Sequence, residues 1–386
     1  MRQLPVLLLT SLTLIALLPA QRQGGGRDRG EGPKLEHFTV EQGALKSDKV
    51  KSGEAGYTIY LPKGYADDAN KDTKYPWIVW LHGFGGASEF GGDGTAVLDK
   101  LRGEDKIPPL AMVVFRSAGR RSVYMNGEAA GDTEDLIVGD LIDTLVKKYR
   151  LSTERGQRAV MGVSAGGFGA LKIAMRHPEV FGTVAVHSAA ILPADPADLA
   201  GTNESIVQRM LRGGLAVEFG DPIDKAKWQQ HMPLAIVALK KPEELKGLNV
   251  YFDAGTEDNY GFCEPNEALD KAMTEKGHKH LFRKVEGGGH AWSSPSMKEC
   301  LAVSLQFVGA AVQGKDPIEA VKPKEEKKPA EASDAKKDEK KGEESACFSL
   351  RGDGPFLEVP ILLDLAWPTH WEGTTDRRQF YFSISR

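Results

Sequence analysis

The sequence lacks several features that define other classes of protein. Its 386 residues include only three cysteines, with no Cys-x-x-Cys pair and no close group of metal-type ligands. It also has no surplus of positive charge, because the formal net charge is -4. A chain without a basic surplus is poorly suited to neutralising the phosphates of a nucleic acid. We expect no metal, no cofactor and no nucleic-acid partner.

Long apolar runs are absent except at the N-terminus. A positively charged start, Met1-Arg2, precedes an apolar run over residues 4–18, which the small residue Ala20 closes. The run is shorter than the roughly 20 residues of a membrane-spanning helix and has the layout of a signal peptide over residues 1–20. We predict a secreted or periplasmic protein with no integral membrane span after cleavage. Retention as an N-terminal membrane anchor is the alternative.

Two of the cysteines, Cys263 and Cys300, lie in the part of the chain that is expected to fold. Export would allow a disulfide between them. Two buried free thiols are an equally good interpretation, because unpaired cysteine behaves as a small apolar residue. The sequence leaves both alternatives open.

Large apolar residues are missing from two further segments. Residues 21–34 are rich in Gly and Arg, and the stretch from Pro323 to Ser345 contains only Lys, Glu, Asp, Ala, Pro, Ser and Gly. Neither segment can bury a core, so we predict a flexible leader at 21–34 and a disordered, Lys/Glu-rich linker at 313–346. Apolar residues return in the tail 347–386, which is too short to hold a core without staples and whose role the sequence does not reveal.

The remaining segment, residues 35–312, alternates short apolar runs with amphipathic stretches. Apolar runs predict strands at 57–61, 77–81, 111–115, 158–161, 183–186, 249–252 and 281–285. Helices are predicted at 134–149, 165–176 and 297–312. This alternation is typical of the α/β class, with a mainly parallel sheet flanked by helices. The long segment 192–246 is predicted to be a helical insertion over the strand ends, where a substrate pocket would be shaped.

The strongest chemical signal is the motif Gly-Val-Ser-Ala-Gly-Gly at residues 162–167. It follows a predicted strand and precedes a predicted helix. A nucleophilic serine on a strained strand-to-helix turn needs small neighbours, because the strand and helix backbones nearly touch there. A glycine-rich chain can produce this pattern by chance, so its place between strand and helix carries the prediction that Ser164 is a nucleophile.

A second motif, His-Gly-Phe-Gly-Gly at residues 82–86, follows an earlier predicted strand. Acyl transfer creates an oxyanion, and two backbone N–H groups must already point at it. We predict that Ala165, which follows the nucleophile, supplies one N–H and that Phe84 supplies the other. A plain glycine turn is the alternative for this loop, and His82 is expected to be a structural residue.

The general base is expected on a loop after a late strand, with an acid before it in chain order. His290 fits because it follows the last predicted strand and three glycines, whereas His187 precedes the acid and could line the pocket. Asp258 lies past the end of the preceding strand, where it can hold the Nδ1–H of the base. Asp253 and Glu257 remain alternatives, with Asp253 expected to bond loop amides instead.

These motifs resemble those of the esterase D-like family. The family includes S-formylglutathione hydrolase, tributyrin-type, feruloyl and acetyl-xylan esterases, enterochelin esterases and bacterial mycolyltransferases. The resemblance rests on residues 149–181, 253–258 and 288–292, with Phe-Gly-Asp-Pro and a tryptophan in mid-chain, and covers roughly 56–312. One departure is Ala165, where many members have methionine, but its backbone N–H does not depend on the side chain.

The resemblance implies an eight-stranded α/β-hydrolase core with Ser164, Asp258 and His290 as a catalytic triad. We therefore expect a secreted serine carboxylesterase that cleaves small-molecule or polysaccharide-linked esters through an acyl-enzyme. An acyltransferase that passes the acyl group to a sugar or lipid alcohol is the first alternative. A catalytically silent binding protein that keeps the fold is the second.

Overall fold

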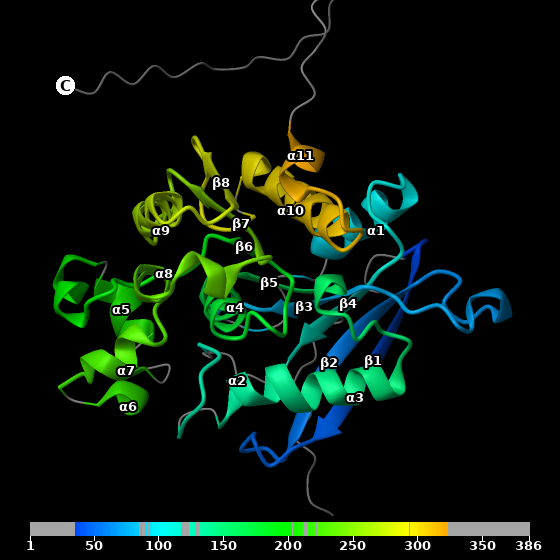
Figure 1. Cartoon of the computed structure of the whole chain (residues 1–386), viewed down its shortest axis with the longest axis horizontal. Helices are drawn as coiled ribbons and strands as arrows, with labels where there is room; N and C mark the ends of the chain where they lie inside the picture. Colours follow the sequence, from blue (N-terminus) through cyan, green and yellow to red (C-terminus); the bar gives the residue numbers. More distant parts are fainter. Residues whose placement is uncertain are drawn as a thin grey trace, which may run out of the picture. The chain divides into compact units, whose positions relative to one another are not determined.

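The computed structural model of the protein describes residues 35–322 (Figure 1). Short gaps in this description fall at residues 85, 87–89, 91–92, 117–122, 129–130, 203, 211–214, 221 and 293. The predicted signal peptide, the leader, most of the predicted linker and the C-terminal tail thus lie outside the described residues. In the described part of the chain, no helix is both long and apolar enough to cross a bilayer.

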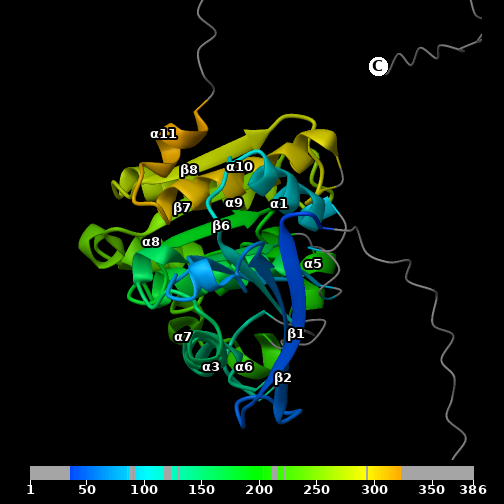
Figure 2. The same cartoon turned by 90° about the vertical axis from the view of Figure 1, so that its right-hand side faces the viewer.

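One sheet of eight strands forms the centre of the described chain, in the order β1-β2-β4-β3-β5-β6-β7-β8. The strands are β1 (Phe38–Lys46), β2 (Glu54–Pro62), β3 (Trp77–Leu81), β4 (Ala111–Phe115), β5 (Arg158–Val163), β6 (Thr183–His187), β7 (Asn249–Gly255) and β8 (His280–Val285). The pairs β1–β2 and β2–β4 are antiparallel, and all later pairs are parallel. The mainly parallel α/β sheet expected from the sequence is confirmed, and Figure 2 shows β1 and β2 at one edge of it.

The central strands are buried on both faces because helices cover both. All five residues of β3 are buried, and they alternate between two apolar clusters. Trp77 and Val79 belong to one cluster, whereas Ile78 and Trp80 belong to the other. A strand buried in this way reads as a continuous apolar run, which is why the sequence predicts it at the same residues.

Helices form a layer on each face of the sheet (Figure 1). One layer holds α1 (Asp93–Gly103), α10 (Pro295–Ala311) and α11 (Pro317–Val321). The other holds α2 (Thr133–Asp135), a π-helical segment (Leu136–Leu141), α3 (Ile142–Lys148), α4 (Ala165–Arg176), α8 (Pro233–Leu239) and α9 (Cys263–Glu275). Short 3-10 helices occur at Asp68–Asn70, Arg155–Gln157, Pro196–Gly201 and Pro242–Leu245.

The predicted helical insertion lies between β6 and β7. It contains α5 (Glu204–Met210), α6 (Ala216–Phe219) and α7 (Lys225–Gln229) in addition to α8. A third apolar cluster, distinct from the two that flank the sheet, contains Trp228 of the insertion together with Phe168 and Phe262. Because Phe168 lies in the first turn of α4 and Phe262 follows β7, this cluster sits beyond the carboxyl ends of the strands.

The structure corrects two details of the sequence interpretation. The segment predicted as one helix over 134–149 consists of α2, the π-helical segment and α3, because apolar spacing does not distinguish a π-helical turn from an α-helical one. The predicted linker 313–346 begins too early, since α11 lies within it and packs Ile318 and Val321 against the cluster of α10.

The alternatives for the cysteines are resolved in favour of thiols. Cys263 and Cys300 are both buried and unpaired. Burial is the main cause that raises the pKa of the Cys300 thiol to about 12. A thiol with so high a pKa carries almost no thiolate at neutral pH, so Cys300 has no nucleophilic role.

Candidate active site

Ser164 occupies the turn between β5 and α4 in a strained conformation. Its φ of 56° and ψ of -120° are unfavourable for any residue other than glycine. Three hydrogen bonds hold this backbone: Ser164 N donates to His187 O at 2.9 Å, and Ser164 O accepts from the N–H groups of Phe168 at 2.9 Å and Ala190 at 3.0 Å. The side chain is only partly buried, so the turn presents its hydroxyl at the carboxyl edge of the sheet.

The glycines around Ser164 are needed because three backbones meet there. A Cβ on Gly162 would lie 2.4 Å from the carbonyl oxygen of Gly166. A Cβ on Gly166 would lie 2.1 Å from the carbonyl oxygen of Leu81 and 2.5 Å from that of His82. No side chain fits at these distances. These close backbone approaches are the geometric reason for the small residues of the motif.

His290 and Asp258 form a hydrogen-bonded pair on two neighbouring loops. His290 Nδ1 lies 2.8 Å from Asp258 Oδ2, and the Asp258 side chain is fully buried. The other carboxylate oxygen accepts the N–H of Tyr260 at 2.8 Å, and the Tyr260 ring packs edge-on to the imidazole at 4.5 Å between centroids. This pairing fixes the ring and leaves its Nε2 as the nitrogen that can take up a proton.

The loop of His290 is tied to the strand beside Ser164. Ala291 N donates to Ser188 Oγ at 3.0 Å, and Ser188 directly follows β6, whose last residue His187 pairs with Val163. The hydroxyl of Ser164 and the imidazole of His290 both lie at the carboxyl edge of the sheet. Both residues are described by the structure, and no hydrogen bond joins their side chains. In unliganded sites such bonds are often long and tighten only when substrate binds.

The alternative acids and bases have other places in the structure. Glu257 is exposed, and its backbone N–H donates to Gly288 O. Asp253 does not bond loop amides as expected: its Oδ2 lies 2.7 Å from His187 Nδ1 and 3.0 Å from the Tyr251 hydroxyl. His187 is fully buried, so the expectation that it could line the pocket is wrong.

His187 belongs to a second Ser-His-Asp arrangement, which no motif in the sequence predicts. Its Nε2 lies 3.0 Å from the hydroxyl of Ser304 on α10, while its Nδ1 bonds Asp253. All three residues have no exposed surface. A substrate cannot reach a serine that is buried in the layer between sheet and helix, so this arrangement is structural.

The proposed oxyanion donors lie at the start of α4 and on the loop after β3. Ala165 is the first residue of α4 and is buried, and Phe84 is partly buried against the cluster of the insertion. His82 is buried, its Nδ1 lies 2.7 Å from Gly83 O, and burial lowers the pKa of its imidazole. The Nδ1 of His82 is therefore engaged with the backbone of its own loop, as suits a structural residue.

Comparison with known proteins places this chain in a family. Residues 50–299 match the family model Esterase, described as "putative esterase". An endo-1,4-beta-xylanase/feruloyl esterase of Xylanibacter ruminicola is 27% identical over 156 residues, which are 38% of this chain and 21% of that protein. The S-formylglutathione hydrolase of Paracoccus denitrificans is 31% identical over 140 residues, 36% of this chain and 43% of that one. The chain thus spans less than half the length of either relative.

Solved structures show the same fold. A ferulic acid esterase superimposes with a TM-score of 0.57 at 23% sequence identity, over 71% of this chain and 99% of that chain. At this identity the likeness establishes the fold alone, which is that of the α/β-hydrolases.

Proposed function

Because the chain belongs to this esterase family and has the α/β-hydrolase fold, we propose that it hydrolyses carboxylic esters with Ser164, His290 and Asp258 as its catalytic triad. The observation that carries the proposal is the pair of His290 with the buried Asp258 carboxylate, at the edge of the sheet where Ser164 has its strained turn. The strained backbone conformation of Ser164 is one that folded proteins rarely keep without a functional reason.

The proposed reaction has two steps. His290 Nε2 takes the proton of Ser164, whose oxygen attacks the ester carbonyl, and Asp258 stabilises the imidazolium that forms. The backbone N–H groups of Ala165 and Phe84 bind the resulting oxyanion. When the C–O bond to the alcohol breaks, His290 donates its proton to the leaving oxygen. Water then attacks the acyl-enzyme with His290 again as the base, the bond from the acyl carbon to Ser164 breaks, and His290 returns the proton to the Ser164 oxygen as the acid leaves.

The experiment that tests this proposal is the replacement Ser164→Ala, assayed with p-nitrophenyl acetate. We expect kcat to fall at least about 1,000-fold, because no other group can form the acyl-enzyme. Ser304→Ala is the matched control. Ser304 also bonds a histidine that is paired with an aspartate, but Ser304 is buried and out of reach of a substrate. A fluorophosphonate probe should label the wild type and Ser304→Ala but not Ser164→Ala. Labelling of Ser164→Ala, or retained hydrolysis, contradicts the proposal and favours a silent protein or another nucleophile.

The proposal also covers the acceptor of the acyl group and the class of ester that serves as substrate. We propose water as acceptor and an extracellular, polysaccharide-linked ester as substrate, supported by the expected signal peptide and by the relative named as a feruloyl esterase. Assays on acetyl, butyryl and feruloyl esters, with and without sugar or glycerol as a competing alcohol, test both points. Acyl transfer to the alcohol in preference to water would identify the acyltransferase alternative.

A further inference from the structure

Tyr124 holds the loop that carries the proposed Phe84 donor. Its hydroxyl donates to His82 O at 2.7 Å, and its ring packs against the His82 ring at 5.8 Å between centroids. His82 is the residue between the end of β3 and the Gly83-Phe84 turn. The same carbonyl oxygen lies close to Gly166, so the Tyr124 hydroxyl fixes the contact between the donor loop and the nucleophile turn.

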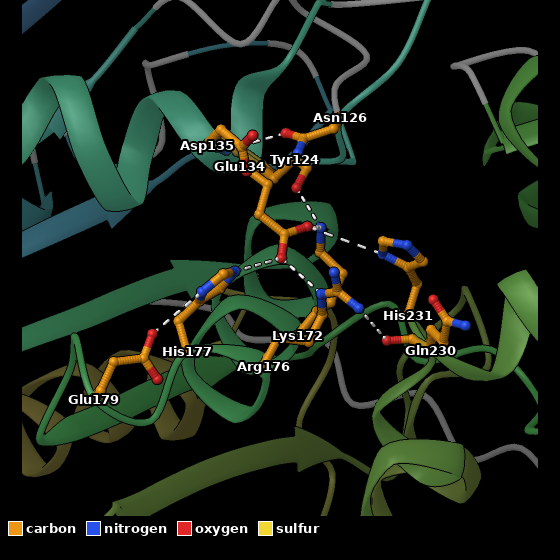
Figure 3. A network of polar contacts seen from close by, with 10 residues as sticks. All are labelled: Tyr124, Asn126, Glu134, Asp135, Lys172, Arg176, His177, Glu179, Gln230 and His231. Carbon is orange, nitrogen blue, oxygen red and sulfur yellow. Dashed lines mark hydrogen bonds and ion pairs between the residues drawn. The ribbon is translucent and has the colours of Figure 1, made fainter.

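Tyr124 is in turn held by a buried ion pair. Its φ of 56° is unfavourable for a residue with a side chain, so this conformation needs external support. The Lys172 ammonium donates to Tyr124 O and to Glu134 Oε2, the latter at 2.7 Å. Figure 3 shows Lys172 between the backbone of Tyr124 and the carboxylate of Glu134. Lys172 has no exposed surface, and Glu134 is 1% exposed, so water does not compete for these contacts.

The position of Lys172 on α4 gives this network a consequence for catalysis. Ala165, the other proposed donor, begins the same helix, and Lys172 follows it by about two turns. One rigid helix therefore carries one donor at its start and, through Lys172 and Tyr124, holds the loop of the second. Oxyanion donors must be fixed to within about half an ångström to stabilise the transition state.

We propose that Tyr124 is a positioning residue for the oxyanion site, and that the Glu134–Lys172 pair sets its conformation. This inference rests on the proposed function. Tyr124 does not touch the substrate: its hydroxyl acts through His82 O, which orients the Phe84 N–H. The ring also needs Gly169 on α4, since a Cβ there would lie 2.5 Å from the Tyr124 ring.

The test is Tyr124→Phe, which keeps the ring and removes the hydroxyl. We expect kcat for p-nitrophenyl acetate to fall about 10-fold with KM changed less than twofold, because complete loss of an oxyanion donor costs about 100- to 1,000-fold and misplacement costs less. Binding of a trifluoromethyl ketone, which forms a tetrahedral oxyanion on serine, should weaken by a similar factor. Tyr149→Phe is the matched control, because it removes a hydroxyl bonded to Glu41 Oε2 at 3.1 Å, on a different part of the fold.

The outcomes separate this inference from the proposed function. If Ser164→Ala is inactive but Tyr124→Phe has the wild-type kcat, or if Tyr149→Phe loses as much, the positioning role is wrong. If Ser164→Ala stays active, the proposed function itself has failed. Should Tyr124→Phe not fold, Gly169→Ala provides a second test, because it displaces the ring and keeps the hydroxyl. A fall in kcat with unchanged KM supports the role, and an unchanged kcat contradicts it.

Discussion

At the scale of single residues, the loop of His290 depends on two strained backbones. Ser188 has a φ of 43° and Ala291 a φ of 50°, and the hydrogen bond from Ala291 N to Ser188 Oγ joins them. Each left-handed residue costs roughly 1 kcal/mol, so neither conformation persists without support from its surroundings. Ser188 is thus placed to act on catalysis through the geometry of the neighbouring histidine, although it is not a member of the triad.

We predict that Ser188→Ala lowers kcat about fivefold to 20-fold. The substitution removes the acceptor of the Ala291 N–H while it keeps the Cβ, so the backbone strain at 188 is unchanged. A loosened loop presents His290 to Ser164 less often, which lowers the rate of acylation. Steady-state hydrolysis of p-nitrophenyl acetate measures the effect, with Ser52→Ala, an exposed serine bonded to Glu54 O, as the control. Equal kcat in both variants would show that the Ser188 hydroxyl does not support the base.

At the scale of elements, Glu134 joins the helix pair α2–α3 to α4. Its carboxylate lies 2.7 Å from Lys172 Nζ, 2.7 Å from Arg176 Nε and 3.0 Å from His177 Nε2 (Figure 3). Burial by itself would raise the pKa of Glu134, but the attraction of Lys172 and the bond from His177 outweigh it and hold the pKa far below its usual value. The carboxylate is therefore charged at neutral pH and central to the contact between the two elements.

We predict that Glu134→Gln destabilises the fold by about 3 to 5 kcal/mol. The amide keeps the shape but leaves the ammonium of Lys172 buried without a counter-charge, which is the costly way to break an ion pair. Urea unfolding at pH 7, followed by circular dichroism, measures the change. Glu267→Gln is the control: this residue pairs with Lys284 at 2.7 Å on the surface, where the expected loss is below about 1 kcal/mol. Equal losses in the two variants would contradict a special role for the buried pair.

The elements that the sequence predicts best are those that are buried over almost their whole length. The strands β3 and β4 and the helix α4 occur at the predicted residues, because all residues of the two strands and all of the helix except Arg176 are buried. The edge strand β1 is not predicted, since only Phe38 and Leu45 of its nine residues are fully buried and the alternation is lost. Lysine is rarely buried in folded proteins, so the sequence does not predict that Lys172 lies in the core and pairs with Glu134.

In the proposed site, too, the residues that belong to local motifs are predicted from the sequence, whereas those placed by long-range contacts are not. Ser164, His290 and Asp258, the proposed triad, are predicted from local motifs, because each motif combines a strand end with glycines that a close backbone approach demands. Tyr124 is missed because it lies in a loop without a motif and acts through a contact 42 residues away. Ser188 carried a usable signal, as a polar residue directly after a buried strand. The insertion is predicted only as helices, because the packing of its apolar cluster depends on contacts between residues far apart in the sequence.

At the scale of the whole molecule, acid should destabilise the fold in two stages. Burial, followed by the charges of Lys172 and Arg176, lowers the pKa of His231 from 6.5 to about 3. The unfolded chain therefore binds a proton at this residue as the pH falls below about 6.5, whereas the folded protein does not until about pH 3. Glu134 adds a second stage below pH 4.5, since its folded pKa also lies below the unfolded value. Both contributions are present at neutral pH and are lost as the pH falls.

The replacement His231→Gln tests the first stage. In the wild type the free energy of unfolding should fall between pH 6.5 and 4.5 with a slope of up to about 1.4 kcal/mol per pH unit from this residue alone. The glutamine does not titrate, so its variant should show a flatter curve from pH 6.5 down to about pH 3, and it should keep the loss below pH 4.5 to which Glu134 contributes. Urea unfolding at half-unit steps of pH measures both limbs. A variant curve parallel to the wild type above pH 4.5 would assign that limb to other groups, such as His82, whose pKa burial also lowers.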